Sequence, residues 1–133
     1  MIARVFCIGA ALLAAAAAEA QNYPVRAVRL VVPYVPGGGT DFTARVIAPK
    51  LSEALGQQVV VENRPGGGTI IGTEAVARAA PDGHTLLVST SAIAINPATY
   101  RKLPYDTLRD LAPVTLVLSM PFIAVVHPSV PAR

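Results

Sequence analysis

The stretch VRLVVPYVPGGGTDFTARVIAPKLSEALG (residues 28–56) decides the fold class. Residues 28–34 are apolar and rich in β-branched side chains, which predicts a buried strand. The turn that follows contains three glycines, and Thr40 or Asp41 can then cap a helix that ends at Gly56. The apolar residues expected on the inward face of this helix are Ala44, Ile47, Ala48, Leu51, Ala54 and Leu55.

The same order of elements repeats further along the chain. Residues 58–62 predict a second strand, and residues 69–80 predict a second helix. Residues 84–89 predict a third strand, residues 90–96 a loop or helix start, and residues 97–100 a short helical turn. Apolar strands that alternate with helices favour parallel pairing and right-handed crossovers. The sequence therefore predicts an α/β fold, with a parallel sheet between two layers of helices.

Two further expectations concern packing and the C-terminal part. The second helix is expected to turn Ile71, Ala75, Val76 and Ala79 inward. Residues 103–112 are expected to be mostly irregular. Two more strands are expected at residues 114–118 and 122–126, because both runs are apolar.

The N-terminus is typical of a secretory signal peptide. Residues 5–18 carry no charge, and they are too few to span a bilayer, which takes about 20 apolar residues. Ala18 and Ala20 supply the small side chains that signal peptidase requires, so residues 1–20 are expected to be removed before Gln21. A buried or interfacial N-terminal helix is the alternative. Export would place the protein outside the cytoplasm.

Composition argues against several function classes. The chain has 11 Lys and Arg against 8 Asp and Glu, a scattered net charge of +3, and it has no Trp. It therefore offers no basic patch or stacking surface for nucleic acid. The one cysteine, Cys7, lies in the expected leader, so no disulfide or cysteine-based metal site is expected. We expect no metal, no cofactor and no nucleic-acid partner.

One motif occurs twice, each time between a predicted strand and a predicted helix. PGGGT stands at residues 36–40 and again at residues 65–69. In a parallel sheet both loops should lie beyond the carboxyl ends of the strands, where ligands bind in open α/β sheets. Helix starts offer unpaired N–H groups, and glycine lets a ligand approach the backbone closely. Together with Thr90 and Ser91 of the third loop they can form an anion cradle, although simple tight turns are the alternative.

Common enzyme motifs are missing. The chain has no nucleotide-binding glycine motif of the Walker or dinucleotide type and no Gly-x-Ser-x-Gly. Asp41 and His84 could act as bases, but a helix-capping acid and a structural histidine explain them better. Arg64 could clamp a carboxylate, pair with Glu62 or Asp41, or be solvated. A small exported α/β hydrolase-type enzyme remains the alternative to a binding protein.

Ordered stretches of the sequence resemble one family, the Bug family. They are YP (23–24), VRLVVPYVPGGGTD (28–41), LGQQVVVENRPGGG (55–68), APDGHTLL (80–87), AINPATY (94–100), LPYD (103–106) and LAPVT (111–115). Members of this family are the extracytoplasmic solute-binding receptors of tripartite tricarboxylate transporters.

The resemblance implies a two-lobed, hinge-closing periplasmic binding protein that catalyses nothing. It implies an organic acid as ligand, membrane transporter subunits as partners, and a monomer when the protein is full length. In this family, the ligand carboxylate is held mostly by backbone amides of the loops and by ordered water. The ligand-binding residues implied here are Tyr34, Gly37, Gly38, Gly39, Thr40, Asp41, Gly67, Gly68, Thr90 and Ser91.

The resemblance also implies a domain organisation. Residues 1–20 would be the signal peptide, and residues 21–112 the N-terminal portion of the first α/β lobe. Residues 113–133 would begin the crossover toward a second lobe. Because family members are more than twice as long as this chain, that lobe would be largely missing. A truncated product without function is a third interpretation.

Overall fold

Three parallel strands form the centre of the molecule. The computed structural model describes residues 23–121, 123, 125–127 and 129–130, so the expected signal peptide lies outside the described residues. The strands are β1 (Val28–Val32), β2 (Val59–Asn63) and β3 (Thr85–Leu87), in the order β2-β1-β3. All pairings are parallel, which confirms the predicted α/β class.

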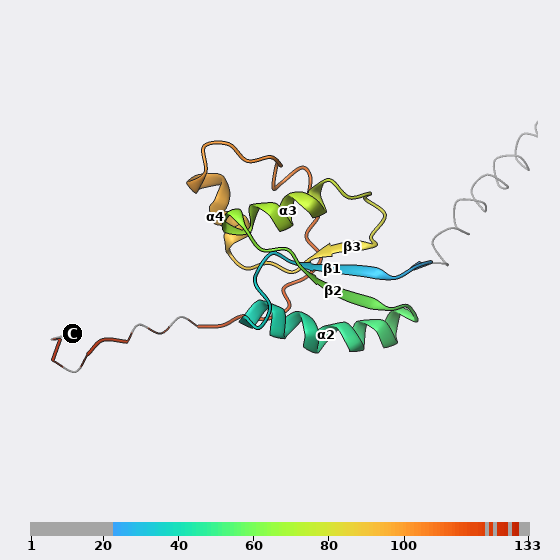
Figure 1. Ribbon diagram of the computed structural model, residues 1–133, viewed down its shortest axis with the longest axis horizontal. Helices are drawn as coiled ribbons and strands as arrows, with labels where there is room; N and C mark the ends of the chain where they lie inside the picture. Colours follow the sequence, from blue (N-terminus) through green and yellow to red (C-terminus); the bar gives the residue numbers. More distant parts are fainter. Residues whose placement is uncertain (1–22, 122, 124, 128, 131–133) are drawn as a thin grey trace, which may run out of the picture.

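Helices cover both faces of this sheet. Helix α2 (Gly39–Leu55) packs on one face, and α3 (Ile70–Ala77) packs on the other (Figure 1). The short 3-10 turn η2 (Gly67–Thr69) leads into α3, and α4 (Ala92–Thr99) lies against η2. The predicted three-layer arrangement is therefore confirmed. Within the described residues no helix has the length and hydropathy needed to cross a membrane.

The core lies between β1 and α2. Val28, Leu30 and Val32 of β1 are buried on one face, and Val31 is buried on the other, as expected for a central strand covered on both faces. Ala44 and Ala48 bring α2 close to the sheet, and Ile47, Leu51 and Leu55 pack partly against it, as predicted. Ala54 is exposed, contrary to the prediction. Gly56 ends the helix in the left-handed conformation with φ 66°, which confirms its role as C-cap.

The inward face of α3 differs from the prediction. Ile71 is 54% exposed, whereas the neighbouring Gly72 and Thr73 are buried. The helix begins at Ile70 after a left-handed turn, and this start sets which residues face the sheet. Gly72 then lies so close to Pro33 that a Cβ would stand 2.7 Å from the Pro33 Cβ and from the Arg64 carbonyl oxygen. The absence of a side chain at Gly72 is what allows this approach.

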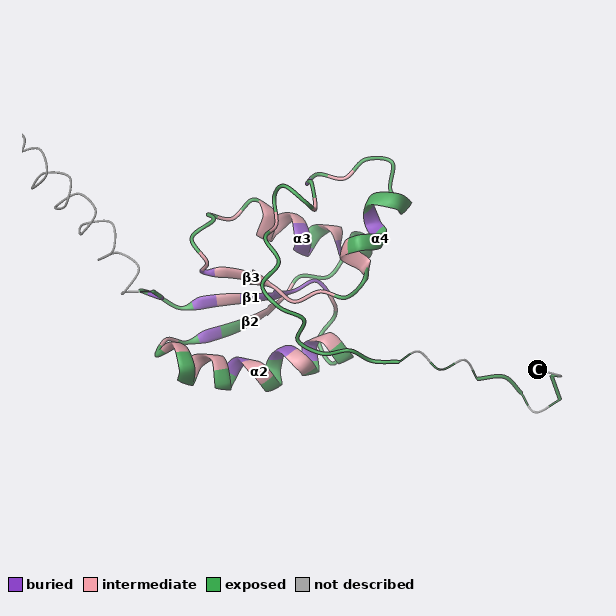
Figure 2. Cartoon of the chain, turned by 180° about the vertical axis from the view of Figure 1, so that it is seen from behind, coloured by how far each residue is buried: buried purple, intermediate pink, exposed green. Residues whose placement is uncertain are grey.

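The two strands predicted near the C-terminus are not part of the sheet. Residues 114–118 belong to no strand, and Val114 and Leu116 are each 82% exposed. Phe122 and Ala124 lie outside the described residues, and Ile123, Val125 and Val126 belong to no strand. Figure 2 shows this exposed segment leaving the body of the fold. A β-rich sequence forms a strand only when a neighbouring strand can pair with it, and within the described residues this segment has none.

Candidate ligand-binding site

The loops after the three strands meet at one edge of the sheet. In the parallel register Val32 stands beside Asn63, and Val31 stands beside Leu87, so all three strands end together. The first and third loops touch, because the Tyr34 hydroxyl lies 2.6 Å from Thr90 Oγ1. The second loop is tied to α4, which follows the third loop. The structure therefore brings the three predicted loops to one edge.

Asp41 holds the first loop in place but does not cap the helix α2 that follows it. The N-cap of α2 is Gly38, and no side chain caps the helix, so the prediction that Thr40 or Asp41 is the cap is wrong. Asp41 lies in the first turn and is only 3% exposed. Gly37, which turns back with φ 86°, donates its N–H to Asp41 Oδ2 over 2.9 Å. The carboxylate thus satisfies a loop amide that precedes the helix.

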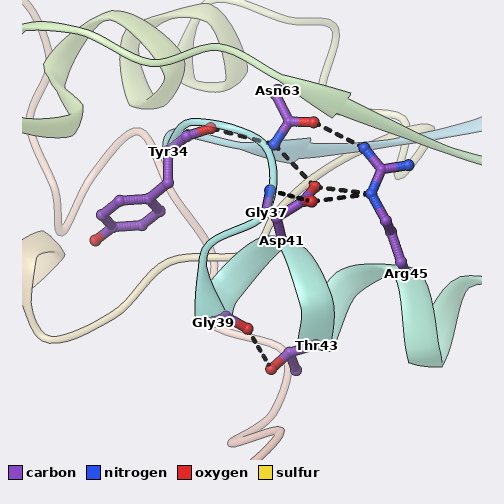
Figure 3. Close-up of polar contacts among 7 residues, drawn as sticks. All are labelled: Tyr34, Gly37, Gly39, Asp41, Thr43, Arg45 and Asn63. Carbon is purple, nitrogen blue, oxygen red and sulfur yellow. Dashed lines mark hydrogen bonds and ion pairs between the residues drawn. The ribbon is translucent and has the colours of Figure 1, made fainter.

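Two side chains complete the contacts of the Asp41 carboxylate (Figure 3). Arg45, one turn further along α2, donates Nε–H to both oxygens over 2.9 and 3.0 Å. Asn63, at the end of β2, donates Nδ2–H to Asp41 Oδ1 over 2.9 Å. The Arg45 bonds, then the Gly37 amide and the Asn63 bond, lower the pKa of Asp41 to about 2. Asp41 is therefore ionised and paired at neutral pH.

The second loop has an unusual backbone that α4 supports. Gly66, Gly67, Gly68 and Thr69 have positive φ angles of 126°, 57°, 62° and 81°. A β-branched residue such as Thr69 rarely adopts this conformation. Asn96 of α4 donates its Nδ2–H groups to the Gly68 carbonyl over 3.0 Å and to Thr69 Oγ1 over 3.1 Å. Asn96 is itself buried, so these bonds fix the second loop from its interior side.

Arg64 does not project as a free cation at this edge. Its Nε donates to Glu62 Oε1, and Arg29 donates to the other oxygen of Glu62 over 2.6 and 2.9 Å. The bond from Arg64 has the largest effect and those from Arg29 the next largest, and together they lower the pKa of Glu62 below its ordinary value. One of the three interpretations of Arg64, pairing with Glu62, is thereby confirmed.

His84 lies at the opposite end of the sheet. Its carbonyl accepts the N–H of Arg29 at the start of β1, whereas Asp41 follows the end of β1. The ring is buried, packs edge-on against Tyr23 at 5.0 Å, and places Nδ1 3.0 Å from the Asp82 carbonyl oxygen. The two candidate bases therefore do not meet. In the described part of the chain, no group of three or more His, Cys, Asp or Glu side chains could hold a metal ion.

Sequence reasoning missed three polar residues of this edge, Arg45, Asn63 and Asn96. Asn63 carried a usable signal, because it directly follows the second predicted strand and so had to lie at the same edge as Asp41. Arg45 carried another, since it stands four residues after an acid on the same helix. Asn96 carried none, because its contacts depend on the turn geometry of the second loop.

The resulting edge suits a small anion. It presents glycine backbone at the start of α2, where helix geometry leaves N–H groups without intrahelical partners. The Tyr34, Thr90 and Ser91 hydroxyls add donors from the first and third loops. Arg45 balances the negative charge of Asp41, so the edge carries no net acidic charge from that pair.

Comparison with known proteins agrees with this fold. Residues 43–133 match the model of the tripartite tricarboxylate transporter family receptor. Protein BugT of Bordetella pertussis is 46% identical over 116 residues, which are 86% of this chain and 36% of BugT. The chain thus spans about a third of the length of the curated relatives it matches.

Solved structures show the same similarity. The periplasmic binding protein BugD is 42% identical, with a TM-score of 0.64 over 66% of this chain and 29% of that one. MatC from Rhodopseudomonas palustris, solved with bound malate, is 40% identical, with a TM-score of 0.62 over 71% of this chain and 33% of that one. On the family match and on this fold, the chain belongs to the tripartite tricarboxylate transporter receptor family, which includes the Bug proteins.

Proposed function

We propose that this chain supplies the carboxylate-binding edge of an extracytoplasmic solute-binding receptor, which captures an organic acid for a tripartite transporter. The observation that carries the proposal is the meeting of three glycine- and hydroxyl-bearing loops at the carboxyl edge of the parallel sheet. The malate bound to MatC supports a carboxylate as the ligand class.

The loops would divide the work of binding. The amides of Gly38, Gly39 and Thr40 would receive the carboxylate at the start of α2, and the hydroxyls of Tyr34, Thr90 and Ser91 would complete its hydrogen bonds. Gly37, whose N–H already bonds to Asp41, would let the ligand approach the loop backbone closely. Gly67 and Gly68 would let the ligand approach the second loop. Asp41 would brace the first loop instead of touching the ligand, because Gly37, Arg45 and Asn63 already bond to its carboxylate.

The whole receptor would need more than this edge. We propose residues 21–112 as part of the first lobe and residues 113–133 as the start of the passage to a second lobe, which would close over the ligand and exclude water. A signal peptide at residues 1–20 would deliver the receptor to the periplasm as a monomer, where it would meet the membrane subunits of the transporter.

We propose that the receptor catalyses nothing. The family to which the chain belongs is one of receptors. The two residues considered as bases, Asp41 and His84, lie at opposite ends of the sheet, and Asp41 is held in an ion pair. These positions favour binding over hydrolysis.

A chimera tests the proposal. The aligned part of MatC is replaced by residues 23–121 of this chain, and the purified chimera is titrated with malate, other dicarboxylates, neutral sugars and cationic amino acids. A dicarboxylate should bind and raise the melting temperature, since a hundredfold excess over Kd adds about 2.7 kcal/mol of stability. A folded chimera that responds only to sugars or cationic amino acids would refute the proposal.

A further inference from the structure

Asn63 connects three parts of the chain through one side chain. It is the last residue of β2, and its register partner is Val32 at the end of β1. Its Nδ2 donates to the Tyr34 carbonyl over 3.1 Å and to Asp41 Oδ1 over 2.9 Å, while its Oδ1 accepts from Arg45 Nη2 over 3.0 Å. Figure 3 shows the carboxamide between the first loop and α2.

The chemistry of the neighbours allows only one orientation of this carboxamide. Two acceptors, a carbonyl and a carboxylate, face its amino group, and a guanidinium donor faces its oxygen. Both N–H groups and the carbonyl of Asn63 are therefore used. An aspartate of the same size could not donate to Tyr34, and it would place a second negative charge beside Asp41.

These bonds fix both ends of the first loop. Tyr34 is its first residue after Pro33, and Asp41 holds the N–H of Gly37 in its middle. The backbone between them carries the glycine amides that we propose as ligand donors. We infer that Asn63 is the positioning residue of the first loop, which sets ligand affinity without touching the ligand. This inference rests on the proposed function for its ligand and on the hydrogen bonds for its geometry.

Asn63→Asp is the direct test, and Gln58→Glu is its matched control. Both substitutions turn a carboxamide into a carboxylate, but Gln58 is exposed and precedes β2 at the opposite edge of the sheet. In the MatC chimera, Asn63→Asp should weaken malate binding by roughly tenfold or more, as loss of an orienting second partner commonly does. Gln58→Glu should leave the malate Kd within twofold of the parent.

A swap of the two groups separates positioning from a general loss of stability. In the double variant Asp41→Asn with Asn63→Asp, the new amide can donate to the new carboxylate, and Arg45 can still pair with it. This pair should recover part of the affinity lost in Asn63→Asp, which a merely structural defect would not do. Malate affinity of Asn63→Asp equal to that of the parent would overturn the inference, as would a double variant weaker than both single ones. If Asn63→Asp does not fold, Asn63→Ala, which adds no charge, is titrated with malate in its place, and the same loss of affinity is expected.

Amide hydrogen exchange at Gly37 distinguishes failure of this inference from failure of the proposed function. It is measured without ligand, in the 133-residue chain and in the chimera. Faster exchange at Gly37 in Asn63→Ala, with Gln58→Glu unchanged, supports positioning even if no carboxylate binds the parent. Unchanged exchange at Gly37 in Asn63→Ala overturns positioning even if the parent binds malate.

Discussion

Asp41 carries a negative charge next to the loop that we propose binds an anion. A free carboxylate there would repel the ligand, but Arg45 pairs with it and Asn63 and Gly37 donate to it. The residue therefore acts on the shape of the loop and contributes little net charge. This role explains how an acid can stand beside the proposed anion site.

Substitution of Asp41 tests its role as a brace. Asp41→Ala should lower the melting temperature of the folded chimera by about 5 °C or more, because the Gly37 amide, Arg45 and Asn63 lose their shared acceptor. Glu53→Gln is the control, since Glu53 is exposed on the same helix. Thermal melts followed by circular dichroism measure both. A melting temperature equal to that of the parent, together with complete loss of malate binding, would point instead to direct ligand contact.

The pH dependence of stability follows from the same carboxylate. The pKa of Asp41 is about 2 in the folded chain against an ordinary 3.8. As pH falls, the unfolded chain binds the proton first, so the stabilisation is complete above about pH 4 and is lost toward pH 2. Urea denaturation between these pH values should therefore show that the free energy of unfolding falls less for Asp41→Asn than for the parent. Equal slopes would mean that Asp41 has an ordinary pKa in the folded chain.

At the scale of elements, the strands and α2 could be predicted because their signals are local. Three short apolar runs, each followed by a turn and helical spacing, were enough for β1, β2 and β3. The start of α3 at Ile70 was predicted to within one residue, but the exposure of Ile71 was not, since it depends on four successive positive φ angles from Gly66 to Thr69. The start of α4 at Ala92 fits one of the two alternatives for residues 90–96, a loop or a helix start. The short helical turn expected at residues 97–100 is instead the end of this helix, with Pro97 inside it.

Gly72 tests how closely α3 must approach the sheet. Gly72→Ala should destabilise the protein by about 1–3 kcal/mol, because the new Cβ would meet Pro33 and the Arg64 carbonyl at 2.7 Å. Gly39→Ala is the control, since a Cβ there meets nothing within 4 Å and alanine favours a helix. Urea denaturation compares the two. A Gly72→Ala variant as stable as Gly39→Ala would show that α3 does not pack as described.

At the scale of the molecule, the sequence predicts that the three loops share one edge of the sheet, but it does not predict the side-chain hydrogen bonds that hold them there. Parallel topology alone places Tyr34, Gly67 and Thr90 at one edge. The contacts of Asn63 and Asn96 require exact side-chain geometry, which periodicity does not contain. The apolar runs beyond residue 112 predicted strands from composition, but a strand also needs a partner.

The exposed apolar segment should govern how the chain behaves in solution. Val114, Leu116, Met120 and Val125 are each more than 70% exposed. Exposed apolar patches promote association, so the 133-residue chain should form oligomers or aggregates as its concentration rises. Light scattering measures this, and Leu116→Lys with Val114→Lys should reduce it. A parent chain that stays monomeric at high concentration would contradict the prediction.

The proposed function requires that a carboxylate bind at the edge formed by the three loops. The most direct measurement is an amide NMR map of the chimera during titration with malate. The largest shifts should occur at Gly38, Gly39 and Thr40, with further shifts at Gly37, Thr90 and Ser91, while Gly83 at the opposite edge stays unchanged. Shifts centred on Gly83 and His84, or saturating binding that leaves the first loop unperturbed, would contradict it.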